Sequence, residues 1–144
     1  MNKYLNSFSR ALIAVIFIVS GFGKVTEFHQ MVAMAGSAGL PLPTISIAIA
    51  ALIEICAGLS LLFGWQVRWD SLALLVFLIP ATLVFHASHL GDPAQARTQM
   101  VEVLKNLAIM GGLLKFYVDS SGETASAEAR PGVEAADFRA RRAS

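Results

Sequence analysis

One carboxylate, Glu54, lies in the middle of an otherwise apolar run over residues 44–64. As a helix this run would be ~31 Å long, comparable to the hydrocarbon core of a bilayer. An acidic side chain at mid-bilayer costs roughly 2.5 to 3.5 kcal/mol on insertion scales, so it needs a partner from another helix or a bound proton. The position of Glu54 therefore predicts a structural ion pair, or a ligand or proton site, inside a membrane.

Two cations are the candidate partners of Glu54. Counting the rise per residue places Lys105 ~8 Å from the depth of Glu54 on one side and Arg10 ~6 Å from it on the other. In the same count Lys24 lies at the surface, about twice as distant as Lys105. We expect Arg10 and Lys24 to be structural charges or anchors at helix ends. Pairing with either Lys105 or Arg10 would keep Glu54 ionised, whereas desolvation would protonate an unpaired Glu54.

Other polar side chains share the inward faces on which these charges lie. Asn106 follows Lys105 directly, and His86 lies on the third apolar segment. Together with Glu54 and Lys105, these two residues make up the predicted ligand-binding set. His86 and His89 are spaced to share one helix face, but no cysteine or third inward histidine joins them, so we expect no metal site.

The rest of the sequence is organised to carry these groups through a membrane. Hydrophobic residues make up 56% of the chain and charged residues only 15%. Four apolar segments each approach the ~20 residues that a transmembrane helix needs. They cover about residues 4–23, 44–64, 69–90 and 100–118. We predict an all-α fold, with a four-helix transmembrane bundle over residues 1–118 and a short amphipathic helix between spans one and two. Residues 119–144 are predicted to be a disordered polar tail.

Charge sets the expected partners and the orientation. Eleven basic and ten acidic residues give a net charge of +1, which creates no field that would attract nucleic acid. The predicted partner is instead the lipid bilayer. Four spans would place both termini on the side that carries most of the arginines and lysines, so the positive-inside rule predicts that both termini are cytoplasmic.

Taken in order, the inward-facing residues resemble the DoxX family of small four-helix bacterial membrane proteins. The matching stretches run from Arg10 to Lys24, from Gly39 to Pro41, from Glu54 to Arg68, over Phe85 and His86, and from Lys105 to Gly112. The resemblance covers about residues 8 to 118 and depends on the order and spacing of all five stretches. It implies a location in the bacterial cytoplasmic (inner) membrane. It also implies similarity to the DoxD-type subunit of a thiosulfate:quinone oxidoreductase and to DoxX-like proteins associated with oxidative or thiol stress.

Three functions are compatible with this pattern. The leading hypothesis is a redox-associated membrane subunit that binds a quinone or a similar small apolar molecule between its helices. The headgroup would meet Lys105, Asn106 and His86, and a proton would be shared with Glu54. The alternatives are a non-catalytic scaffold or anchor for a soluble or membrane oxidoreductase, and a small transporter. The sequence contains no covalent nucleophile motif. It leaves open whether the chain is an enzyme; if it is one, we expect a quinone-linked oxidoreductase subunit with a quinone as its cofactor.

Overall fold

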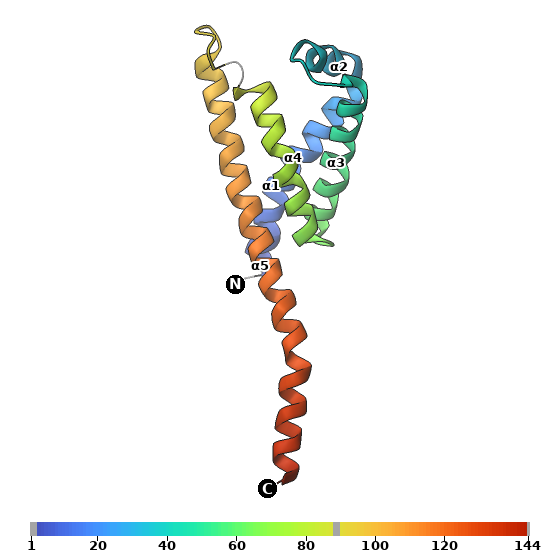
Figure 1. The fold of residues 1–144 in the computed structure, drawn as a ribbon, viewed down its shortest axis with the longest axis vertical. Coiled ribbons are helices and arrows are strands. Elements are labelled where there is room, and N and C mark those ends of the chain that lie inside the picture. Colours follow the sequence, from blue (N-terminus) through green and yellow to red (C-terminus); the bar gives the residue numbers. More distant parts are fainter. Residues whose placement is uncertain (1–2, 88–89, 144) are drawn as a thin grey trace.

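The computed structural model describes the backbone of residues 3–87 and 90–143, and the side chains of residues 4–87 and 90–122. Over these residues the chain is all-α, as predicted, with five helices and no strand (Figure 1). The helices are α1 (Lys3–Thr26), α2 (Phe28–Ser37), α3 (Pro43–Phe63), α4 (Val67–Phe85) and α5 (Ala96–Ala143). The short helix predicted between the first two spans corresponds to α2. His89 lies outside the described residues.

Three helices within the described residues are long and apolar enough to cross a membrane. They are α1 over Tyr4–Thr26, α3 and α4. The predicted fourth span, residues 100–118, forms the first part of α5. It is not among these three because it carries three charged side chains, Glu102, Lys105 and Lys115.

The helices form two pairs. α1 packs along α3, and α4 packs along α5, while the short turn at Gly64 joins the pairs by connecting α3 to α4 (Figure 1). α2 lies across one end of the bundle, called here the α2 end. The opposite end, where Gly64 lies and α1 begins, is called the Gly64 end. A buried apolar core joins the two pairs and consists of Ala14, Phe17, Ala57, Leu61, Leu74, Leu78, Leu113 and Phe116.

Glycines allow α1 and α3 to approach closely. A Cβ atom on Gly21 would lie 2.7 Å from Cγ1 of Ile55 and 3.1 Å from Cβ of Glu54. A Cβ atom on Gly58 would lie 3.0 Å from Cγ1 of Ile18. Small residues at helix interfaces in membranes permit this kind of backbone approach. The carboxylate of Glu54 is thereby brought directly against α1.

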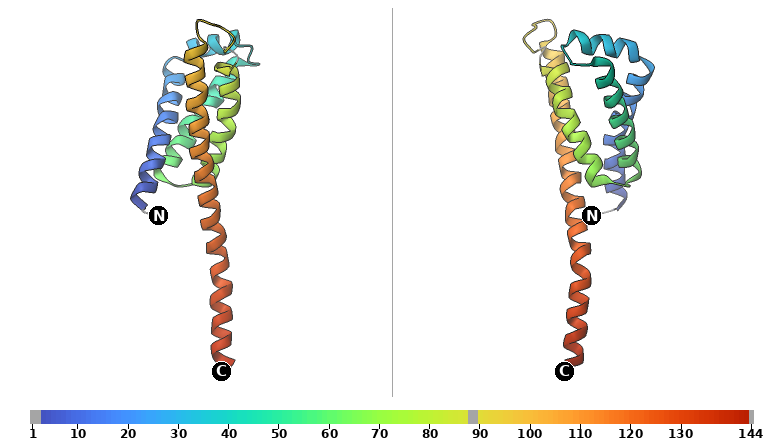
Figure 2. Two further views of the ribbon diagram at one scale, coloured as in Figure 1. Left: turned by 90° about the vertical axis from the view of Figure 1, so that its left-hand side faces the viewer. Right: turned by 45° about the vertical axis from the view of Figure 1, so that its right-hand side comes forward.

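The far end of α5 leaves the bundle. α5 continues to Ala143 and projects well beyond the Gly64 end (Figure 2). The side chains from residue 123 onward lie outside the described residues. The disordered polar tail over residues 119–144 therefore stays a prediction.

Candidate functional site

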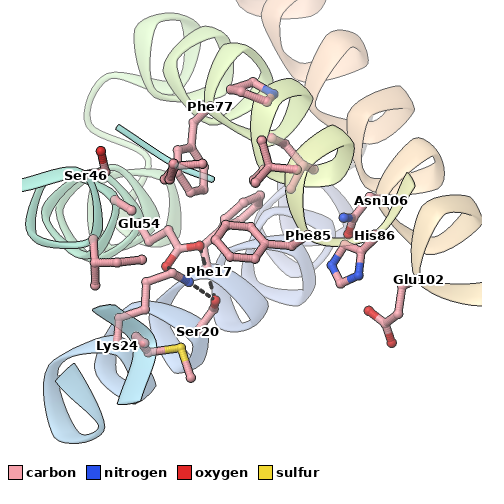
Figure 3. A pocket seen from close by; sticks show the side chains of 18 of the residues that line it. Phe17, Ser20, Lys24, Ser46, Glu54, Phe77, Phe85, His86, Glu102 and Asn106 are labelled. Carbon is pink, nitrogen blue, oxygen red and sulfur yellow. Dashed lines mark hydrogen bonds and ion pairs between the residues drawn. The ribbon is translucent and has the colours of Figure 1, made fainter. Parts of the chain in front are cut away.

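A cavity of about 580 Å³ lies between the helices, with lining residues from all five of them (Figure 3). This volume is typical of small-molecule sites. Glu54, His86, Lys105 and Asn106, the four residues predicted to bind a ligand, all contribute to the lining. Lys24 lines the same cavity. The structure therefore brings the predicted set together, while the role of its members as ligand contacts stays a prediction.

The partner of Glu54 is Lys24, so the prediction of Lys105 or Arg10 as its partner is wrong. Nζ of Lys24 lies 2.8 Å from Oε2 of Glu54 and donates a second hydrogen bond, also 2.8 Å, to Oγ of Ser20. The hydroxyl of Ser20 donates to Oε1 of Glu54 at 3.2 Å. The three side chains form a closed network at one wall of the cavity (Figure 3).

The error has a physical cause in the geometry of α1. This helix does not end at Gly23 but continues to Thr26. Lys24 therefore belongs to the same rigid helix as Ser20 and lies one turn after it. The close approach at Gly21 places α3 beside that turn. A lysine side chain has a flexible four-carbon stem and can direct its ammonium group away from the depth of its own backbone. Counting rise per residue ignores this reach. Lys24 is consequently not a surface anchor but one half of a buried pair.

Lys105 has a different partner, on its own helix. Its ammonium group pairs with the carboxylate of Glu102, three residues earlier. On the same side of the cavity, Nδ1 of His86 lies 2.9 Å from Oε1 of Gln99. An amide oxygen only accepts, so Nδ1 donates this bond and, in a neutral ring, Nε2 carries the lone pair. In this tautomer His86 can accept a hydrogen bond through Nε2.

A buried hydrogen bond between two side chains joins α4 to α5. Nδ2 of Asn106 donates to Oγ1 of Thr82 at 2.9 Å, and that hydroxyl donates to the backbone oxygen of Leu78 at 2.7 Å. Both polar side chains are buried. The bond to Thr82 uses the amide NH₂ group of Asn106 and leaves its carbonyl oxygen to serve as an acceptor.

The remaining lining is predominantly apolar. Phe17, Phe77 and Phe85 border the space, and α2 contributes Met31 and Met34 at its end (Figure 3). Among the described residues, no three His, Cys, Asp or Glu side chains lie close enough to hold a metal ion. The cavity thus has an apolar, aromatic middle between two separate polar groups.

Arg10 lies outside the cavity, at the Gly64 end. A Cβ atom on Gly64 would lie 2.7 Å from Nη2 of Arg10, so the guanidinium group covers this glycine. Nη2 also donates to Oγ of Ser7 at 3.3 Å. Gly64 has φ +77° and ends α3 in the left-handed conformation. The charge of Arg10 complements the partial negative charge at the C-terminus of that helix.

Fold and cavity together define a small helical membrane protein with a polar and aromatic cavity between its helices. The chain belongs to the DoxX family, whose model matches residues 5–87. It is 29% identical over 117 residues to inner membrane protein YqjF of Escherichia coli K12, covering 79% of this chain and 82% of that protein. Inner membrane protein YphA of the same organism is 25% identical over 116 residues, covering 79% and 81%. No solved structure matches the chain.

Proposed function

We propose that this chain is a four-span inner-membrane protein that binds a quinone, or a similarly small apolar ring compound, in the cavity. The names of the two Escherichia coli relatives support the inner-membrane location. The cavity itself carries the proposal, because an apolar middle with a few polar groups at its edges is typical of small-molecule sites. A scaffold without a ligand would not need this space.

Features of α5 support a fourth span over residues 100–118. All three of its charged side chains are compensated on the helix itself, since Lys105 pairs with Glu102 and Lys115 pairs with Asp119. The side that faces the bundle buries Asn106, Leu113 and Phe116. Large apolar side chains cover the outer side and include Leu104, Leu107, Leu114 and Val118. Four spans would place both termini on one side of the membrane, and the positive-inside rule assigns that side to the cytoplasm.

The two polar groups suit a ring that carries oxygen atoms on opposite edges. On the α1–α3 side, the ammonium group of Lys24 uses two of its three N–H donors on Ser20 and Glu54 and has one for a ligand, and Glu54 can share a proton. On the α4–α5 side, the ammonium group of Lys105 can donate to the second oxygen of a quinone. Nε2 of His86 and the carbonyl oxygen of Asn106 can accept from the hydroxyl group that this oxygen becomes when the ring is reduced. The aromatic side chains of the lining would contact the faces of the ring. A redox partner, soluble or membrane-bound, would supply or remove electrons.

The proposal predicts that quinone binding depends on the free volume of the cavity. Ala81 lines the cavity and is a suitable position for filling it, because the substitution leaves the polar groups in place. We expect Ala81→Phe to weaken binding of a short-chain ubiquinone by about tenfold or more, since tenfold corresponds to about 1.4 kcal/mol. Binding is measured by thermal shift and by mass spectrometry of quinone that copurifies from native membranes.

The matched control for this experiment is Ala108→Phe. Ala108 is exposed on α5 and does not line the cavity, so this substitution adds the same side chain outside the cavity. We expect it to bind the ubiquinone as the wild type does. Equal binding by Ala81→Phe and wild type would contradict the proposal. So would a wild-type protein that copurifies with no quinone and shows no thermal shift with the added compound.

A further inference from the structure

Three buried polar atoms in the described part of the chain have no hydrogen-bond partner, and all three lie toward the Gly64 end. They are Nε of Arg10, Nε of Arg68 and Oγ of Ser71. Buried donors are normally satisfied, so unsatisfied donors at one place require an explanation. Two of the three belong to guanidinium groups, whose paired N–H donors fit the oxygens of a phosphate.

Both arginines lie at the turn between α3 and α4. Arg10 on α1 covers Gly64, and Arg68 follows four residues later in the first turn of α4. The guanidinium carbon of Arg68 lies 5.3 Å from the ring centre of Trp69 and 5.6 Å from that of Tyr117. These rings hold the guanidinium in place by cation–π contact.

Charge at this end is not balanced by neighbouring carboxylates. Among the described residues, neither arginine takes part in an ion pair. Of the two nearby acids, Asp119 pairs with Lys115, and Asp70 accepts a 2.5 Å hydrogen bond from the neutral hydroxyl of Ser60. The described part of the Gly64 end therefore has two arginines that form no direct ion pair.

Aromatic side chains place this end at the level of lipid headgroups. Trp65 is 75% exposed and Trp69 is 58% exposed, and Trp65 stacks on Phe63 at a centroid distance of 5.2 Å. Exposed tryptophans beside an apolar helix are typical of the membrane interface. Arg10 and Arg68, which form no ion pair among the described residues, are therefore expected at the depth of the lipid phosphates.

We propose that Arg10 and Arg68 bind the phosphate group of an anionic phospholipid at the Gly64 end. This site is separate from the cavity and goes beyond the proposed quinone function. Terminal N–H groups of both guanidinium groups would donate charge-assisted hydrogen bonds to the phosphate, and the acyl chains would cover the apolar outer faces of the neighbouring helices.

The test uses the delipidated full chain in a neutral detergent. Phosphatidylglycerol, phosphatidylcholine or inorganic phosphate is added, and retention is measured by native mass spectrometry together with the thermal midpoint. We expect phosphatidylglycerol to be retained and to raise the midpoint, and neither phosphatidylcholine nor inorganic phosphate to match it. Equal effects of the two lipids would overturn the proposal. An equal effect of inorganic phosphate would assign the site to a soluble anion and overturn the lipid assignment.

Variants separate a specific site from general charge attraction. The double variant Arg10→Gln with Arg68→Gln should lower phosphatidylglycerol retention by about tenfold, because it removes both guanidinium groups. Lys115→Gln is the matched control, since Lys115 is a basic residue on the neighbouring part of α5 whose charge is already paired. It should retain the lipid as the wild type does. Wild-type retention by the double variant would show that the arginines do not form the site.

Discussion

Glu54 with Lys24, and Glu102 with Lys105, are acid–lysine pairs that line the same cavity from opposite sides. The first joins two helices, and its lysine and glutamate side chains are only 17% and 5% exposed. The second joins residues three apart on one helix, with exposures of 44% and 33%. Burial removes the solvent that screens an ion pair and would hydrate a lone charge. Identical chemical groups are therefore expected to have very different effects on stability.

The largest effect should follow from breaking the buried pair. Glu54→Gln leaves the ammonium group of Lys24 without its anion, and removing one partner of a buried pair costs about 3 to 5 kcal/mol. The double variant Lys24→Met with Glu54→Gln should recover most of this loss, because no unpaired charge remains. Chemical denaturation of the purified protein in detergent measures both values. A double variant as unstable as Glu54→Gln would mean that the pair does not behave as a buried unit.

An intermediate effect is expected where α1 and α3 are closest. Gly21→Ala places a methyl group against Ile55 and Glu54 and should destabilise the protein by about 1 to 3 kcal/mol through overpacking. Gly111→Ala is its control, because a Cβ atom there has no heavy atom within 4 Å. That substitution should be neutral or stabilising by up to about 1 kcal/mol, as expected from helix propensity. Similar losses from both substitutions would contradict the close approach that positions Glu54.

The smallest effect is expected from the exposed pair. Lys105→Met should change the free energy of unfolding by less than about 1 kcal/mol, because exposed pairs within one helix contribute little. The same denaturation experiment provides the measurement. A loss as large as that of Glu54→Gln would show that Lys105 also supports a buried charge, and would remove the difference between the two sides of the cavity.

Much of the architecture could be predicted from the sequence because it depends on local pattern. Runs of apolar residues of bilayer length indicated α1, α3 and α4, and the mixed segment after the first span indicated α2. The inward face of α3 was also predictable, since small residues share a helix face with Glu54. The same reasoning failed on α5, where Lys105 and Ala108 on the small-residue face are exposed. All four predicted ligand-binding residues still line one cavity.

The partner of Glu54 could not be obtained in the same way. Its choice depends on the extension of α1 to Thr26, on the close contact at Gly21 and on the direction of a flexible lysine stem. The available signal in the sequence was the spacing of Ser20 and Lys24, which lie one helical turn apart on either side of Gly21. This spacing places both polar side chains on one face of α1, next to the small residue that lets α3 approach. Depth counted along ideal helices favoured Lys105 and Arg10 over Lys24, whereas in the structure Lys105 pairs with Glu102 on its own helix.

The sequence by itself determined that this chain is an α-helical membrane protein, and it marked Glu54 as a charge that needs a partner. Periodicity and apolar length suffice for these conclusions, because both follow from the geometry of a single helix in a bilayer. Only the tertiary structure decided that Lys24 is the cation that pairs with Glu54. It also decided that a cavity separates the polar side chains of the α1–α3 side from those of the α4–α5 side. Those properties depend on how closely and at what height different helices meet, and side-chain packing between them sets both.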